Sequence, residues 1–316
     1  MKKYSVYVDG QEGTTGLEIN ERLALRSDVE ILKIDPEKRR EINERKKLLN
    51  RADIIFLCLP DDAAREAVAM VENPSACIID ASTAHRTNDD WAYGLPELGK
   101  EYRRKIENSK RISVPGCYPT GFNLLIHPLV KEGIIRADYP LNCHAISGYS
   151  GGGKKLIAMY QSENKEDRKN LNSPCFYALK LQHKHQPEMK KHSMLDFEPL
   201  FTPVVADFYR GMTVTVPLHL KLMDKKISAQ ELHTFYCNYY KGEKVVRIAP
   251  FNAEDNFELG FMNAESCVNT DDIELLIFGD NRSGDERQIL LAARLDNLGK
   301  GASGAAVQCM DIAIVV

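Results

Sequence analysis

The stretch YSVYVDGQEGTTG, residues 4–16, decides how the chain begins to fold. Residues 4–8 are rich in β-forming side chains, and they end at glycines spaced as G-x-x-G-x-x-G before a helical pattern over 15–25. A strand, a glycine turn and a helix in this order favour a dinucleotide site over a plain turn, because glycines let the backbone approach a pyrophosphate near the free N–H groups of the helix. The residues expected to contact that pyrophosphate are Gly10, Gly13, Thr14, Thr15 and Gly16.

Strands and helices continue to alternate after this unit. The short apolar segments 29–34, 54–59 and 76–80 are typical of strands in a parallel sheet that is buried on both faces. The helix over 15–25 has Leu17, Leu23 and Ala24 as candidates for its buried face, and the charge-rich segment 36–51 is interpreted as a solvent-exposed helix. This alternation predicts a doubly wound, Rossmann-type α/β domain.

The second half of the chain has a different pattern. Its β-rich segments, 212–222, 244–248 and 273–279, surround one helical segment, 229–240. They predict an α+β domain built on a largely antiparallel sheet. The chain closes with the segment 290–298, a glycine-rich turn and a helix over 305–312.

Composition excludes several classes of protein. The 316 residues suit about two domains, since a domain has about 150 residues. Lys and Arg number 42 against 45 Asp and Glu, a net charge of −3, which speaks against a nucleic-acid binder or a polybasic membrane patch. The longest apolar run, Ile54–Leu59, falls far short of the roughly 20 residues of a membrane span. Eight scattered cysteines without a Cys-x-x-Cys pair favour free thiols and a cytoplasmic protein.

The end of the second strand bears on the choice of coenzyme. Asp35 lies 19 residues beyond Gly16 (35 − 16), where an acid suits the ribose 2′-hydroxyl of NAD. Lys38, Arg39 and Arg40 follow, and an arginine here accommodates the 2′-phosphate of NADP, unless these cations only begin a solvated helix. The residues alone do not decide between NAD and NADP.

Of the eight cysteines, Cys117 has the most distinctive setting. It lies in ISVPGCYPTG, residues 112–121, directly before a helical apolar segment. A Pro-Gly before it and a proline two residues after it place Cys117 at a helix N-terminus. The helix dipole favours a thiolate there, so we interpret Cys117 as a nucleophile for a carbonyl carbon; a buried structural cysteine is the alternative.

The sequence QHKHQPE, residues 182–188, supplies a proton partner. Histidine ordinarily has a pKa near neutral and can accept or donate a proton, so His183 and His185 are candidates for acid/base chemistry. Metal binding is the rival interpretation, because His-x-His on a strand would point both rings to one side. No cysteine or carboxylate accompanies the pair at a familiar ligand spacing, so we expect no metal.

Two more glycine-rich segments require an explanation. Residues 147–155, SGYSGGGKK, could surround an anion with N–H groups and hydroxyls, although they do not match a P-loop. Residues 300–305, KGASGA, open the final helix. Plain connection is the alternative for both.

Taken together, seven motifs resemble those of a known family across nearly the whole chain. They are the glycine loop 10–16, DASTAHR (80–86), YGLPE (93–97), PGCYPTG (115–121), SGYSG (147–151), HKHQPE (183–188) and KGASG (300–304). In this order they resemble N-acetyl-gamma-glutamyl-phosphate reductases, in their shorter (type 2) variety. The resemblance implies NADP(H)-dependent reduction of N-acetylglutamyl phosphate to the semialdehyde, with release of phosphate, through a cysteine thioester in arginine biosynthesis. It also implies a homo-oligomer.

The resemblance assigns domains and roles to this sequence. It implies an NADP-binding domain over 1–116 with 290–316, and a catalytic and oligomerisation domain of the semialdehyde-dehydrogenase kind over 117–289. Glu12 departs from the usual small, hydroxyl-bearing loop and brings a negative charge near the diphosphate. The implied roles are Cys117 as nucleophile, His183 (or His185) as acid/base, Ser82 at the cofactor, and Arg86, Ser147, Gly148 and Ser150 as substrate anchors. Arg39 is the further cofactor candidate, from its position after the second strand.

Two other functions are compatible with these residues. An aspartate-semialdehyde dehydrogenase would use the same thioester chemistry on a different acyl substrate. A regulatory protein that senses NADP would bind the cofactor but leave Cys117 unreactive.

Overall fold

The computed structural model describes residues 3–39, 41–280 and 287–314. Arg40, one of the cations considered above, lies outside them. The chain divides into two compact units, Met1–Gly116 with Ala302–Val316, and Cys117–Gly301. The expected return to the first unit at residue 290 is therefore corrected to 302. The reason is that the strand Gln288–Leu295 (β13) pairs with two strands of the second sheet.

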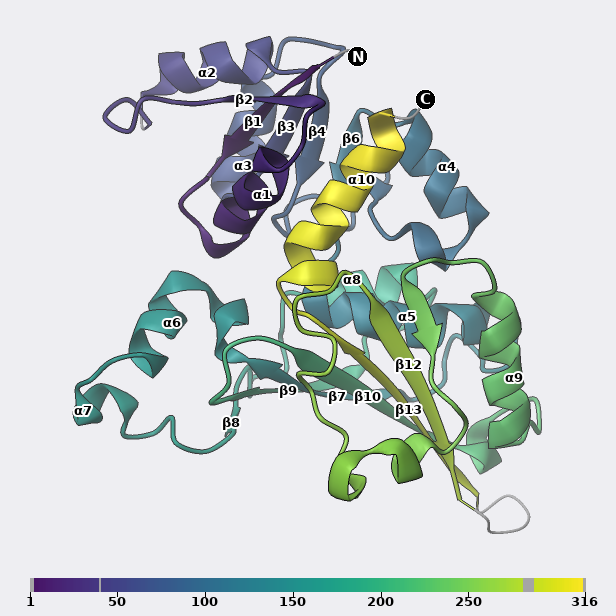
Figure 1. The fold of residues 1–316 in the computed structure, drawn as a ribbon. Helices are drawn as coiled ribbons and strands as arrows, with labels where there is room; N and C mark the ends of the chain where they lie inside the picture. The colour runs from purple at the N-terminus through teal and green to yellow at the C-terminus, as the bar shows by residue number, and fades with distance from the viewer. Residues whose placement is uncertain (1–2, 40, 281–286, 315–316) are drawn as a thin grey trace. The chain divides into compact units, whose positions relative to one another are not determined.

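The first unit contains a parallel six-stranded sheet in the order β2-β1-β3-β4-β6-β5 (Figure 1). All of its strand pairs are parallel, as the apolar segments predicted. The strands are β1 (Tyr4–Asp9), β2 (Val29–Leu32), β3 (Ile54–Leu57), β4 (Cys77–Asp80), β5 (Ala92–Tyr93) and β6 (Arg111–Ser113), and the helices are α1 (Thr14–Ala24), α2 (Ile42–Arg51), α3 (Asp61–Met70), α4 (Lys100–Asn108) and α10 (Gly304–Ile314).

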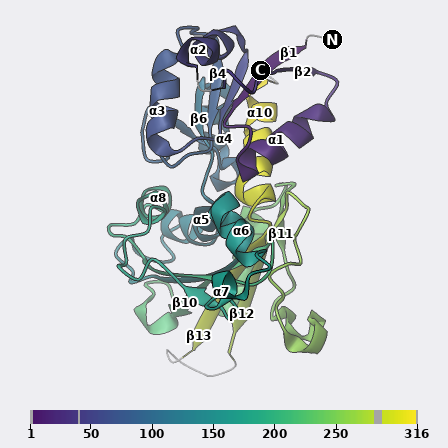
Figure 2. The same cartoon turned by 90° about the vertical axis from the view of Figure 1, so that its left-hand side faces the viewer.

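Alternation along these strands builds a separate core on each face of the sheet. Val6 and Val8 of β1 pack with α1, α4 and α10, whereas Tyr7 between them packs with α2 and α3. Figure 2 shows α2 and α3 on one side of the strands and α1 and α10 on the other. The doubly wound α/β fold is confirmed, and its last helix comes from the C-terminal end of the chain.

Two local expectations in this unit are corrected. On α1, Ile19 and Leu23 are buried while Leu17 and Ala24 are exposed. Ile19 and Leu23 share a face with Gly16 at i, i+3 and i+7, whereas Leu17 and Ala24 lie on the solvent side. The helix expected over 36–51 begins only at Ile42, after a turn.

The second unit contains a mixed seven-stranded sheet in the order β11-β12-β13-β10-β7-β9-β8. The β11–β12 and β7–β9 pairs are parallel and the remaining pairs are antiparallel, which confirms the α+β prediction. Its strands are β7 (Asn142–Gly148), β8 (Cys175–Phe176), β9 (Leu200–Ala206), β10 (Met212–His219), β11 (Val246–Ile248), β12 (Ile273–Gly279) and β13.

Helices cover this sheet and carry the chemically interesting side chains. The helix α5 packs on β10 and β13, α8 packs on α5, and α9 packs on β12 (Figure 1). Within the described residues, no helix is long and apolar enough to cross a membrane. The helices are α5 (Cys117–Lys131), α6 (Gly153–Tyr160), α7 (Lys165–Arg168), α8 (Gln186–His192) and α9 (Ala229–Tyr239).

Candidate active site

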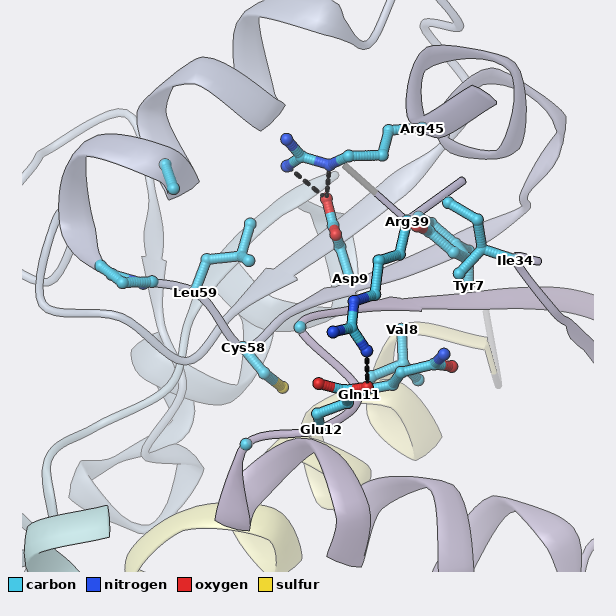
Figure 3. Close-up of a pocket in the computed structure, with 14 residues that line it drawn as sticks. Tyr7, Val8, Asp9, Gln11, Glu12, Ile34, Arg39, Arg45, Cys58 and Leu59 are labelled. Atoms are coloured by element: carbon cyan, nitrogen blue, oxygen red, sulfur yellow. Dashed lines mark hydrogen bonds and ion pairs between the residues drawn. The ribbon is translucent and has the colours of Figure 1, made fainter. Parts of the chain in front are cut away.

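A pocket of about 590 Å³ opens at the carboxyl ends of β1 and β3 in the first unit (Figure 3). The loop Gly10–Gly13 forms one wall, and Cys58–Pro60 after β3 forms another. Gly10 has a φ of +86°, and a Cβ there would lie 2.3 Å from the Cys58 carbonyl oxygen, so the turn requires glycine. Ligands bind at such strand ends, where the order of a doubly wound sheet reverses.

Two arginines reach into this pocket, and each is paired with an acid. Arg45 of α2 donates to the buried carboxylate of Asp9, with Nη2 2.8 Å from Oδ2. Arg39 forms an ion pair with Glu12 of the glycine loop. Asp35 does not line the pocket; its exposed carboxylate accepts a hydrogen bond from the Glu37 N–H instead.

The residues of this loop fit a pyrophosphate. The Thr14 hydroxyl at the start of α1 is buried, and no hydrogen-bond partner is present for it among the described residues. A Cβ on Gly16 would lie 2.4 Å from the Gly10 carbonyl oxygen, which explains the close packing of the loop on α1. An unsatisfied hydroxyl beside helical N–H groups is a suitable setting for phosphate oxygens.

The loop after β4 is organised by a buried carboxylate. Asp80 accepts hydrogen bonds from the Ser82 N–H at 2.9 Å and from the Ser82 hydroxyl at 2.7 Å, and its Oδ2 lies 2.6 Å from His85 Nδ1. The His85 ring in turn stacks on Trp91. Ser82 therefore sits at the carboxyl end of a central strand, held by Asp80.

Arg86 has a different setting from the one expected of a substrate anchor. It is buried, and it donates to the carbonyl oxygens of Val114 at 2.8 Å and Ala81 at 3.0 Å. These bonds tie the loop after β4 to the end of β6. Arg86 therefore holds the backbone at Val114, and Cys117 follows Val114 by three residues.

In the second unit, Cys117 is the first residue of α5, where its sequence context placed it. The Tyr177 hydroxyl donates to the Tyr118 hydroxyl at 2.9 Å. Burial raises the pKa of Tyr118 well above its usual value, and charges on Tyr177 and Cys117 add to the rise. The two phenols thus lie within electrostatic reach of the thiol. Tyr118 was signalled only by its adjacency to Cys117, and nothing in the sequence marks Tyr177.

The histidine pair lies in the turn before α8 and not on a strand. The His183 ring makes edge contacts with Tyr118 and Tyr177, with centroids 6.1 and 5.7 Å apart. Burial, with a smaller effect of Lys184, lowers the pKa of His183 to about 4, which corrects the near-neutral value expected for this residue. The His185 N–H donates to His183 Nδ1 at 3.2 Å, so the neutral ring carries its hydrogen on Nε2.

The glycine-rich segment after β7 is largely occupied by its own contacts. The N–H groups of Gly148, Tyr149 and Ser150 donate to carbonyls of Gly211, Phe208 and Tyr209. They are therefore not available to surround an anion, contrary to the expectation for Gly148. The two serine hydroxyls are the groups of this segment that can still contact a ligand, because a hydroxyl both donates and accepts. In the structure Ser147 donates to the Gly148 carbonyl, and Ser150 accepts from Asn297 at 2.9 Å.

Another segment that sequence reasoning left without a role supports the cysteine. The buried carboxylate of Asp296 pairs with Arg210 at 2.9 Å, and its backbone carbonyl accepts from the Gly301 N–H. A Cβ on Gly301 would lie 2.8 Å from Cys117 Cβ. Glycine at 301 therefore lets this segment pack directly against the start of α5.

Family models match both parts of the chain. Residues 26–108 match the NAD binding domain of semialdehyde dehydrogenases, and residues 117–297 match the semialdehyde dehydrogenase dimerisation domain. N-acetyl-gamma-glutamyl-phosphate reductase 2 from Nostoc sp. is 46% identical over 99% of this chain and 97% of its own. The chain belongs to the N-acetyl-gamma-glutamyl-phosphate reductase family. It is thus an oxidoreductase of the semialdehyde dehydrogenase type that uses a nicotinamide dinucleotide.

Other relatives agree with this family and with the fold. The reductase from Sinorhizobium fredii is 46% identical over 98% of both chains. Aspartate semialdehyde dehydrogenase II from Vibrio cholerae, solved in complex with ASA, has a TM-score of 0.72 at 14% identity and covers 99% of this chain and 98% of its own. The Candida albicans enzyme, solved with NADP, has a TM-score of 0.62 at 14% identity and 98% coverage of both. At such identities these two structures support the fold alone.

In the described part of the chain, no group of three or more His, Cys, Asp or Glu side chains is arranged to hold an ion. The interactions of His183 are with aromatic rings and backbone groups, which suit proton chemistry.

Proposed function

We propose that this member of the family reduces N-acetyl-L-glutamyl 5-phosphate to N-acetyl-L-glutamate 5-semialdehyde and phosphate with NADPH, in arginine biosynthesis. The observation that carries the proposal is Cys117 at the first turn of α5, next to the phenol pair that His183 contacts. A nucleophile placed near a group that can accept its proton is the arrangement that acyl transfer needs.

The proposed reaction begins with the cysteine. The Cys117 thiolate attacks the acyl carbon, a C–S bond forms, and the C–O bond to phosphate breaks, leaving a thioester. The backbone N–H groups of Cys117 and Tyr118 at the N-terminus of α5, where a helix favours negative charge, are suited to stabilise the oxygen that becomes negative. NADPH, when bound, supplies the hydride that reduces this thioester.

His183 has a defined part in the proposed mechanism. Its low pKa keeps the ring neutral, and its Nδ1 is already an acceptor for the His185 N–H. We therefore propose that the neutral ring takes up the proton that leaves the Cys117 thiol, that the imidazolium so formed gives this proton to the oxygen of the tetrahedral species, and that the ring takes it back when the C–S bond breaks. This assigns the acid/base role to His183 and a supporting one to His185.

The pocket residues favour NADP(H) over NAD(H). Arg39 lines the pocket, whereas Asp35, the acid that would suit a free ribose 2′-hydroxyl, does not. A guanidinium at this position is suited to pair with the 2′-phosphate. Gly10, Gly13, Thr14, Thr15 and Gly16 are proposed to hold the pyrophosphate, with Ser82 toward the nicotinamide.

For the substrate, we propose the hydroxyls of Ser147 and Ser150 as the contacts from the loop after β7. Charge on Cys117 and the Ser147 hydroxyl both influence the pKa of Tyr118, so this hydroxyl lies in the neighbourhood of the reacting sulfur. We propose that Arg86 acts by positioning the segment before Cys117, because both of its carbonyl contacts lie on that segment or on the loop after β4.

The reverse reaction tests the whole proposal. Purified protein is mixed with N-acetylglutamate semialdehyde, phosphate and NADP⁺, and the absorbance of reduced cofactor is followed. We expect a phosphate-dependent signal, and we expect Cys117→Ser to lower the rate at least about 10³-fold while it still binds NADP⁺, because the hydroxyl is a far weaker nucleophile. Turnover retained by Cys117→Ser would contradict the nucleophile assignment.

The acyl substrate is tested separately. We expect a much higher rate with the acetylated semialdehyde than with aspartate semialdehyde, which has a free amine and a shorter chain. The opposite preference would identify an aspartate-semialdehyde dehydrogenase activity. Binding of NADP⁺ with no turnover of either substrate, and a Cys117 inert to alkylation near neutral pH, would indicate a cofactor sensor.

We further propose a homo-oligomer in the cytoplasm. The match of residues 117–297 to a dimerisation domain supports self-association. All eight cysteines, each within the described residues, are free thiols, which is typical of a reducing compartment. Light scattering of the purified protein measures the subunit number.

A further inference from the structure

The Arg39–Glu12 ion pair lies in the part of the pocket where we propose that the 2′-phosphate of NADP(H) binds. Glu12 belongs to the glycine loop, and Arg39 lies in the turn after β2; both line the same pocket. Figure 3 shows the Arg39 guanidinium directed at the Glu12 carboxylate. The guanidinium proposed to bind the 2′-phosphate is thus already engaged by an anion of the protein itself.

The two arginines of the pocket differ in how easily they can change partners. The Arg45 and Asp9 side chains are only 14% and 7% exposed, so separating them would leave a buried charge without compensation. Arg39 and Glu12 are 43% and 57% exposed, and an ion pair this open to water contributes little stability. Arg45 is therefore a fixed wall of the pocket, whereas Arg39 can exchange one anion for another.

We infer that Glu12 competes with the 2′-phosphate of NADP(H) for Arg39, and that this competition sets how strongly the enzyme prefers NADP(H) to NAD(H). The inference rests on the proposed use of NADP(H). On binding, the phosphate dianion takes the guanidinium and the Glu12 carboxylate returns to water. NAD(H) offers only a hydroxyl at this position, so it gives Arg39 no replacement anion and leaves the pair intact.

The test measures, by titration calorimetry, the affinities of the wild-type protein and of Glu12→Gln for NADP⁺ and for NAD⁺. Glutamine keeps the size of the side chain and removes its charge. We expect the ratio of NADP⁺ to NAD⁺ affinity to rise about threefold, within the range measured for exposed ion pairs, and the gain to shrink in high salt. Because the readout is binding, it does not depend on turnover.

Arg39→Gln separates competition for Arg39 from a general repulsion of phosphates. In that background NADP⁺ should bind about tenfold or more weakly, since a charged contact to the phosphate is lost. Glu12→Gln added to it should no longer change the NADP⁺ to NAD⁺ ratio.

Glu72→Gln is the matched control. It removes the Lys46–Glu72 pair, whose side chains are 43% and 70% exposed and which does not line the pocket. We expect it to leave both affinities within experimental error.

Two outcomes would overturn the inference while leaving the proposed function intact. An unchanged ratio in Glu12→Gln would show that Glu12 does not restrain Arg39. A ratio that rises equally with and without Arg39 would show that Glu12 acts on the cofactor directly. Failure of the wild type to bind NADP⁺ at all would instead contradict the proposed function, and the inference with it.

Discussion

At the scale of single residues, the two histidines of HKH have unlike surroundings despite their adjacency. His183 is surrounded by aromatic rings, and its Nδ1 is fixed by the backbone of His185. The next four residues start α8, so the pair is presented by a turn and not by a strand. The sequence identifies the pair but does not choose between its members. In the folded chain both rings contact Tyr118, and the His183 ring also contacts Tyr177, so the choice depends on tertiary packing.

His183→Asn and His185→Asn should therefore differ in rate. We expect His183→Asn to lower kcat about 10²-fold or more, the usual contribution of an acid/base group, and His185→Asn to have a smaller effect through orientation of its neighbour. Steady-state rates of the reverse reaction, with circular dichroism as the folding control, measure both. A larger loss in His185→Asn would transfer the assignment to that residue.

The lowered pKa of His183 also predicts a pH dependence of stability. Its folded pKa of about 4 lies below the ordinary 6.5, so the unfolded chain binds the additional proton between these values. The free energy of unfolding should fall as pH decreases from about 6.5 towards 4, and His183→Asn should flatten this dependence. Urea unfolding of both proteins across this pH window checks it; parallel curves would contradict the shift.

At the scale of elements, the two acid–arginine pairs near the first glycine loop have different roles. One pair stabilises the fold, and the other lies where we propose that the cofactor binds. The Asp9–Arg45 pair joins the end of β1 to α2 where water is largely excluded, whereas Arg39 only follows β2 in an exposed turn. The pattern of the sequence marked both arginines as members of one charge-rich segment. Only the packing of α2 on the sheet shows that Arg45 is needed to hold the strand end.

Arg45→Met should consequently lower the free energy of unfolding of the first unit by about 3 kcal/mol, because it leaves Asp9 buried and unpaired. Arg39→Gln, the matched change at an exposed pair, should cost less than about 1 kcal/mol. Denaturant unfolding of the two variants gives the comparison. Equal stabilities would indicate that Asp9 is hydrated or protonated when Arg45 is absent.

At the scale of the whole molecule, the first unit is assembled from both ends of the chain. The helix α10 supplies Ala305, Ala306, Cys309 and Met310 to the core on one face of the parallel sheet. The two parts of the first unit are separated in the sequence by the whole second unit, Cys117–Gly301. The first unit therefore cannot complete its core until the residues from Ala302 onward are available.

A chain truncated after Ser303 should therefore lose NADP⁺ binding even though it keeps every residue of the glycine loop. Removal of α10 exposes the apolar surfaces of β4, α1 and α4 that pack against it, and each large side chain uncovered costs about 1.5–3 kcal/mol. Calorimetric titration and a thermal melt of the truncated protein test this. Unchanged NADP⁺ affinity would show that the first unit folds without α10.

The sequence by itself determined what depends on local pattern. The short apolar segments that alternate with helices, the glycine spacing and the proline–glycine context of Cys117 are local patterns in the sequence. They led to the doubly wound sheet, the nucleotide loop and the start of α5. Tertiary structure decided what depends on residues distant in the chain. It paired β13 with β10 and β12, and it paired the Gly148 N–H with the Gly211 carbonyl. It directed Arg86 to backbone carbonyls and brought Tyr177 and Gly301 close to the start of α5. The physical reason is that strand pairing, desolvation and hydrogen-bond partnership are settled between segments, so no local pattern contains them.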